Sequence, residues 1–178
     1  LTPLVVTFWL AVYHLGTPFR GFGDFWAALT AAHFLFAGFG LSLAVGLVGR
    51  ALTSAAPRLV PLHAVVAWGF MLALPVLALG IDGRRSVEIV GVLMYGLLLP
   101  LHASLGLVVA ARFHELSALG RALLALACLS LLVTTAFALG YGLLRHPALD
   151  LATMVKIHGT PNALLVVLGT LTAFALRR

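Results

Sequence analysis

The sequence predicts an all-α fold, a polytopic transmembrane helix bundle, and two observations carry this prediction. The first is composition: 62% of the 178 residues are hydrophobic and only 9% are charged, whereas about 25% of a soluble domain is charged. The second is that apolar runs recur along the chain, each close to the roughly 20 residues that a helix needs to cross a bilayer. So few polar residues could not cover a soluble fold. We therefore expect a multi-pass protein of the cell membrane.

Six apolar segments divide the chain, and the connections between them are short and rich in glycine, proline and charge. We expect spanning helices over Leu1–Leu15, Phe25–Gly49, Leu59–Gly80, Glu88–Arg112, Leu119–Leu144 and Leu151–Leu176. Because no connection could hold a soluble domain, residues 1–178 are interpreted as a single transmembrane domain. The first run begins at Leu1 without the basic start of a signal peptide. We therefore expect the chain to be the C-terminal part of a longer protein.

The basic residues give the predicted orientation. The net charge is +6, and lysines and arginines concentrate in the cytoplasmic loops of membrane proteins. If the six segments alternate in direction, one face collects Arg50, Arg58, Arg112, Arg121, Arg177 and Arg178, and the other collects Arg20, Arg84, Arg85, Arg145 and Lys156. The first face has the larger number, so we expect the C-terminus to be cytoplasmic. The basic residues then meet lipid headgroups, and no nucleic-acid partner is expected.

Four of the seven histidines fall inside predicted spans and away from their ends. Ionisable residues within a bilayer usually face the bundle interior and are functional candidates. Counted from each segment's midpoint at about 1.5 Å per residue, His33 lies about 6 Å and His158 about 8 Å toward the outer face. His102 lies close to the middle, and His63 about 10 Å toward the inner face by the same count. The matching depths favour His33 and His158 as a functional pair, whereas a tie between helices is the simpler interpretation of His63 and His102.

The stretch HGTPN, from His158 to Asn162, interrupts the last predicted span. Pro161 lacks an N–H group, so the carbonyl of Ile157 should lose its helical partner, and Thr160 should leave helical geometry. Asn162 comes one turn after His158, which places both side chains on one face. We therefore expect an imidazole, an amide and a freed carbonyl to point together into the bundle.

Two motifs, TAAHFLFAGF at Thr30–Phe39 and HGTPNAL at His158–Leu164, resemble the YndJ-like family of bacterial integral membrane proteins. The resemblance covers about 20 residues directly and the order of helices loosely. It implies that His33, His158 and Asn162 occupy polar positions of the family, and that further helices precede Leu1. Leu35 departs from the pattern, which often has a second histidine there, and the resemblance supplies no mechanism.

Three classes of function remain open on these observations. In the first, His33, His158 and Asn162 form a catalytic or binding site for a lipophilic isoprenoid or acyl molecule, since histidine transfers protons near neutral pH. Further ligand-binding candidates are Gly38, His102, Thr134, Tyr141 and Gly159. In the second, the chain is an accessory subunit of a larger membrane complex. In the third, His33 and His158 ligate a b-type haem or a metal ion. The sequence assigns no cofactor, and the expected partners are the lipid bilayer, a lipophilic small molecule and other membrane subunits.

Overall fold

The computed structural model confirms the predicted fold class. It describes residues 2–16, 23–81, 84–144 and 149–177, and every named element in these ranges is a helix. Among the described residues, five helices are long and apolar enough to cross a membrane: Asp24–Ala55, Pro57–Gly80, Arg85–Arg112, Ala118–Leu144 and Leu151–Ala175. The first predicted segment is a shorter apolar helix, α1, over Thr2–Leu15. Three of the basic residues that were used to predict the orientation, Arg20, Arg145 and Arg178, lie outside the described residues.

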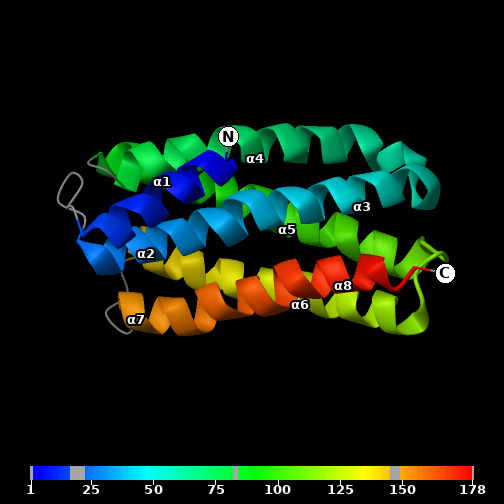
Figure 1. Cartoon of the computed structure of the whole chain (residues 1–178). Helices are drawn as coiled ribbons and strands as arrows, with labels where there is room; N and C mark the ends of the chain where they lie inside the picture. Colours follow the sequence, from blue (N-terminus) through cyan, green and yellow to red (C-terminus); the bar gives the residue numbers. More distant parts are fainter. Residues whose placement is uncertain (1, 17–22, 82–83, 145–148, 178) are drawn as a thin grey trace. The chain divides into compact units, whose positions relative to one another are not determined.

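The chain divides into two compact units, residues 1–43 and 44–178. In unit 1, α1 packs against α2 (Asp24–His33) and against the π-helical segment η1 (Phe34–Gly40) that continues it (Figure 1). The helix then runs on as α3 (Leu41–Ala55) into unit 2. It continues six residues beyond the predicted end at Gly49, because Arg50–Ala55 contains no proline or glycine that would stop it.

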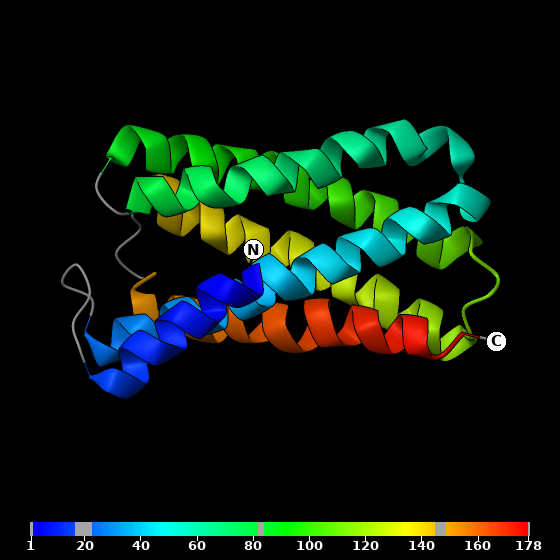
Figure 2. The same ribbon diagram turned by 45° about the horizontal axis from the view of Figure 1, so that its top comes forward.

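Unit 2 is a row of helices in which each neighbour runs antiparallel to the next (Figures 1 and 2). After the short 3₁₀ turn η2 (Pro57–Leu59), α4 (Val60–Ile81) packs on α5 (Arg85–Arg112), and α5 packs on α6 (Ala118–Leu139). The last helix packs on α6 and is built from α7 (Leu151–Met154), η4 (Val155–Gly159), η5 (Asn162–Leu168) and α8 (Gly169–Ala175).

Glycines set the closest approach of α4 and α5. A Cβ atom added to Gly91 would lie 2.7 Å from the Cα atom of Leu77. A Cβ atom added to Gly69 would lie 2.6 Å from Leu98 Cδ2. Small residues at helix contacts are typical of membrane proteins, because close packing replaces the hydrophobic effect as the driving force between helices in lipid. The α4–α5 pair therefore depends on residues that have no side chain.

Four segments of the described residues have π-helical geometry: η1, η4, η5 and η3 (Gly140–Leu144), which extends α6. Well under 1% of residues in proteins are π-helical, and such turns occur frequently at functional sites. His33 directly precedes η1, and His158 lies inside η4. The two histidines that were predicted as a pair thus both border rare backbone geometry, whereas His63 and His102 lie in regular α-helix.

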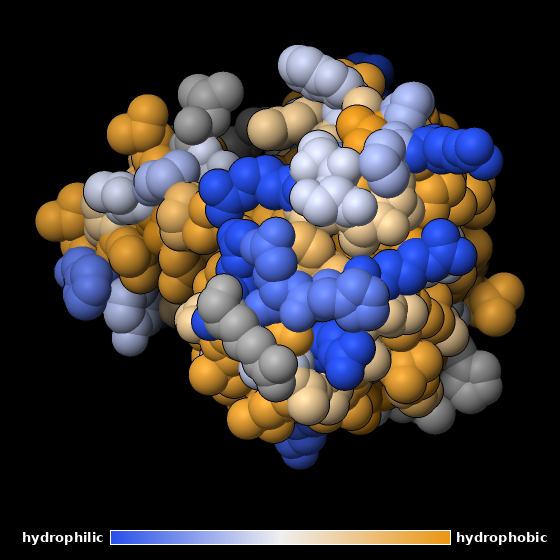
Figure 3. Space-filling view, turned by 90° about the vertical axis from the view of Figure 1, so that its right-hand side faces the viewer, coloured by the Kyte–Doolittle hydropathy of each residue, from blue (hydrophilic) through white to orange (hydrophobic). Residues whose placement is uncertain are grey.

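Hydrophilic side chains gather over the end of unit 2 that carries the C-terminus (Figure 3). Here the turn between α5 and α6 is fastened to the chain end: Arg177 pairs with Glu115, and its guanidinium carbon lies 5.4 Å from the centre of the Phe113 ring. The Ser117 N–H also donates to the Leu176 carbonyl at 3.3 Å. The exposed arginines of this end are Arg50, Arg58, Arg112 and Arg177. The last helix is thereby held in register with α6.

Candidate functional site

Three of the predicted site residues come together between α6 and the last helix of unit 2. The Thr134 hydroxyl donates to Asn162 Oδ1 at 2.7 Å. His158 Nδ1 lies 2.9 Å from the Thr134 carbonyl oxygen. Asn162 Nδ2 lies 3.3 Å from both ring nitrogens of His158. We name His158, Asn162 and Thr134 the polar triad. Thr134 is buried, and the other two side chains are partly exposed.

The partners of His158 select one tautomer. A carbonyl oxygen only accepts hydrogen bonds, so the nitrogen facing it, Nδ1, must carry the proton. In a neutral imidazole the other nitrogen, Nε2, is then the acceptor. A backbone carbonyl on Nδ1 is the usual device by which proteins fix the other ring nitrogen for chemistry or ligation. The polar triad therefore offers a basic Nε2 beside the amide of Asn162.

The predicted break of the helix at Pro161 is wrong. Thr160 keeps helical geometry, with φ −63° and ψ −48°, and Pro161 follows with φ −61° and ψ −37°. The helix instead widens on both sides of the proline into η4 and η5. The Thr160 N–H donates to the Val155 carbonyl five residues back, and the Thr160 hydroxyl donates to the same oxygen at 3.1 Å. Wider turns thus accommodate the missing N–H, and the polar side chains are presented by a continuous helix.

Gly159 and Tyr141 are near the polar triad in sequence but make no hydrogen bond with its side chains in the described part of the chain. Gly159 is exposed, and a Cβ atom added there would meet only the Met154 carbonyl oxygen of its own helix, at 4.0 Å. Tyr141 is 38% exposed. Gly159 thus has open space beside it, and the predicted role of both residues in ligand binding stays a prediction.

His33 and Gly38 belong to unit 1. His33 is exposed and lies edge-on to Phe34, with ring centres 6.3 Å apart. Gly38 is buried, and its carbonyl accepts a hydrogen bond from the Ser42 hydroxyl at 2.6 Å. His33 belongs to a different unit from His158 and Asn162, and the meeting of the three side chains stays a prediction.

The other two histidines that were predicted inside spans have separate environments. His63 Nε2 lies 2.9 Å from the Val45 carbonyl oxygen, and its ring fills the space beside Gly49, so it ties α4 to α3. His102 is 4% exposed on α5 and lies edge-on to Phe70 of α4, with ring centres 6.0 Å apart. Its Nδ1 has no hydrogen-bond partner among the described residues. His102 is therefore not part of the polar triad.

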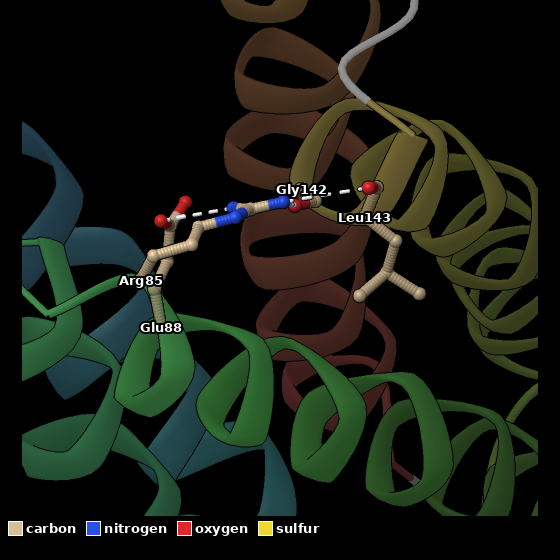
Figure 4. A network of polar contacts seen from close by, with 4 residues as sticks. All are labelled: Arg85, Glu88, Gly142 and Leu143. Atoms are coloured by element: carbon tan, nitrogen blue, oxygen red, sulfur yellow. Dashed lines mark hydrogen bonds and ion pairs between the residues drawn. The ribbon is translucent and has the colours of Figure 1, made fainter.

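One polar network was missed by the sequence analysis, which treated Arg85 only as a loop charge. Arg85 Nη2 donates to the carbonyl oxygens of Gly142 at 2.6 Å and Leu143 at 3.4 Å, while Nη1 lies 2.9 Å from Glu88 Oε2 (Figure 4). Carbonyls at a helix end carry partial negative charge and lack intrahelical donors, so a guanidinium satisfies them well. No sequence signal identifies this contact, because its acceptors are backbone atoms.

Among the described residues, no three histidine, cysteine, aspartate or glutamate side chains gather into a group that could hold a metal ion. The polar triad contributes one imidazole, one amide and one hydroxyl. These groups can accept or donate a proton, orient a hydroxyl or polarise a carbonyl.

Comparison with known proteins gives the family. The chain is 30% identical over 167 residues to the uncharacterized membrane protein YndJ of Bacillus subtilis (strain 168), in an alignment that covers 92% of this chain and 29% of that protein. The chain thus spans less than a third of the length of this relative. No solved structure matches the chain. The family described as YndJ-like protein matches residues 1–166. This match covers most of the sequence, including both motifs, and the chain belongs to the YndJ-like family.

Proposed function

We propose that this membrane protein binds a lipophilic molecule with a polar head, of the isoprenoid or acyl class, at the polar triad. The observation that carries the proposal is the hydrogen-bonded set of His158, Asn162 and Thr134 within two apolar helices. Polar side chains at such positions are costly in a bilayer and are usually retained for a purpose. A ligand arriving from lipid would bring its chain to the apolar helix surface and its head to the triad.

In this proposal His158 accepts or returns a proton, Asn162 orients the head group, and His33 supplies a second acid or base from the other unit. Gly159 would let the ligand approach the helix closely, since nothing fills the space beside it. Gly38, Tyr141 and His102 remain proposed contacts for the apolar part of the ligand. The arginine-rich end would face the cytoplasm, which places the C-terminus there.

The test is to purify the protein in a mild detergent, extract bound lipophiles and identify them by mass spectrometry. A stoichiometric compound should accompany the wild type and His63→Gln, and be lost from His158→Gln and Asn162→Leu. His63→Gln is the matched control because it alters a histidine that only ties two helices. Equal recovery of the same lipids from all four proteins would refute the proposal. The absence of a Soret band from the purified protein would also exclude the hypothesis that His33 and His158 ligate a haem.

A structural role in a larger membrane assembly is the second candidate. It is favoured by the bond of His158 to the Thr134 carbonyl, because the His63–Val45 bond ties α4 to α3 in the same manner. Under this alternative, His158→Gln and His63→Gln should weaken co-purification of partner subunits equally. The ligand proposal expects His158→Gln to lose the bound compound and His63→Gln to keep it.

A further inference from the structure

We propose that the polar triad has two complete hydrogen-bond arrangements, one for neutral and one for protonated His158, and that the Asn162 amide turns over between them. The inference deepens the proposed function, on which its chemical use rests. It names Nε2 of His158 as the atom that takes the proton. It makes Asn162 and Thr134 positioning residues.

The neutral arrangement forms a closed ring of hydrogen bonds. His158 Nδ1–H donates to the Thr134 carbonyl, Asn162 Nδ2–H donates to His158 Nε2, and the Thr134 hydroxyl donates to Asn162 Oδ1. Each of these three donors has an acceptor, and each of the three residues appears once as donor and once as acceptor. The opposite orientation of the amide would place Oδ1 against a bare Nε2, which is two acceptors face to face. Neutral His158 therefore requires the amide as it stands.

Protonation of Nε2 reverses this requirement. The ring then has two N–H groups, and the Asn162 N–H facing Nε2–H would be an unfavourable contact of two donors. Turning the amide by half a rotation brings Oδ1 to Nε2–H and Nδ2–H to the Thr134 oxygen. The Thr134 hydroxyl can then no longer donate to Asn162. A second acceptor is already in place, because Thr134 Oγ1 lies 3.2 Å from the Leu131 carbonyl oxygen of its own helix.

The protonated arrangement is therefore as complete as the neutral one. The proton comes from an O–H group of the bound molecule or of water: the O–H bond breaks, its electron pair stays on that oxygen, which becomes an anion, and His158 Nε2 gains the proton and one positive charge. An uncompensated polar group in lipid costs free energy, so a change of charge is easier where every partner can be re-formed. Two full networks on the same side chains provide this condition.

The charged and titratable groups around His158 do not balance the charge of a protonated imidazole, so the triad itself must stabilise it. On the elements packed against its segment, α6 has Arg121 and Cys128, α7 and η5 have none, and η4 itself has Lys156. Arg121 is at the far end of α6, and Lys156 is exposed two residues before His158, on the other side of the helix. No carboxylate on these elements would balance the imidazolium. Its stabilisation must come from the carbonyl of Thr134 and the amide oxygen of Asn162.

The experiment is nitrogen NMR on protein with ¹⁵N-labelled histidine rings in lipid bicelles, with His158 assigned by its loss in His158→Gln. At neutral to alkaline pH we expect a protonated Nδ1 and a bare, hydrogen-bonded Nε2. Asn162→Leu should keep this tautomer, because the Thr134 backbone is unchanged. In this variant, His158 should also become protonated only at a pH about one unit lower than in the wild type, a tenfold change, because the imidazolium loses the hydrogen bond to the amide oxygen of Asn162.

Ser104→Ala is the matched control, because the Ser104 hydroxyl donates to the Pro100 carbonyl of its own helix, α5, at 2.8 Å, and α5 carries none of the triad residues. It should leave the His158 signals unchanged. A wild-type His158 protonated at Nε2 and bare at Nδ1 would overturn the inference without any variant. So would an Asn162→Leu protein that is protonated as readily as the wild type or more readily, because an amide that cannot turn opposes the imidazolium and its removal would favour protonation. These readings need no ligand, so failure of lipid recovery would count against the proposed function alone.

Discussion

His102 in the α4–α5 pair and His158 in the last helix of unit 2 have opposite environments. In the α4–α5 pair the backbone is regular, and glycines bring the two helices into contact. His102 is buried there, and its Nδ1 has no hydrogen-bond partner among the described residues. In the last helix the backbone widens into π-helical turns, and His158 is bonded through Nδ1 and flanked by an amide. A histidine within an apolar helix is thus not by itself a sign of a polar site. The irregular backbone around it is the more informative feature.

The largest effect should follow from closing the space between α4 and α5. Gly91→Val would place side-chain atoms inside the Leu77 backbone, and overpacking of this kind costs about 3 kcal/mol. Unfolding by SDS in mixed micelles would measure the loss. Gly159→Ala is the counterpart in the last helix, where the space is open, and it should change stability by less than about 1 kcal/mol. Equal losses in the two variants would erase the contrast between the regions.

A smaller effect is expected from separating Thr134 and Asn162. The double-mutant cycle of Thr134→Val and Asn162→Leu should give a coupling free energy of about 0.6–1.7 kcal/mol, the range found for hydrogen bonds between membrane helices. SDS unfolding of the four proteins supplies the cycle. Ser104→Ala combined with Asn162→Leu should be additive, because the Ser104 hydroxyl bonds to the Pro100 carbonyl of its own helix, α5. Additivity in both cycles would mean that the Thr134–Asn162 bond contributes nothing to stability.

His102→Leu should be neutral or stabilise the protein by up to about 1 kcal/mol, because it removes a buried polar atom that has no described partner. His63→Leu should destabilise it by about 1 kcal/mol, because it removes the bond to the Val45 carbonyl. The same unfolding assay compares the two variants. A marked loss of stability in His102→Leu would show that His102 is as well bonded as His63.

The smallest effect concerns the start of the last helix. Hydrogen bonds from Thr153 to Asp150 at the N-cap hold the pKa of this carboxyl below its usual value. A folded-state pKa below the unfolded one contributes stability above about pH 4, and this contribution disappears as the pH falls through the folded value. Asp150→Ala should therefore destabilise the protein slightly at pH 7 and less at pH 3. Asp150→Asn, which keeps an acceptor but does not titrate, should lose this pH dependence, and parallel profiles for all three proteins would contradict the expectation.

Much of the fold could be predicted because it depends on composition along the chain. The predicted span Leu119–Leu144 differs by one residue from the observed Ala118–Leu144, since Ser117 caps its start. The i, i+4 spacing also predicted that His158 and Asn162 share a face, and the bonds between them confirm it. The carbonyl of Thr134 could not be predicted as their third partner, because it depends on how far α6 slides along the last helix. The tolerance of Pro161 depends likewise on the width of the helical turns, which residue types do not reveal.

The hydrogen bonds of Arg85 to the end of the helix that contains α6 limit how Thr134 of the polar triad can move. With its guanidinium on the Gly142 and Leu143 carbonyls and its charge balanced by Glu88, Arg85 fixes α6 lengthwise against α5. The opposite end of α6 is fastened through Glu115 and Arg177. Thr134 lies between these two fastenings, on a stretch of helix that cannot shift along its axis without releasing one of them. His158 therefore docks against a stationary carbonyl, and any rearrangement within the triad falls to the side chains.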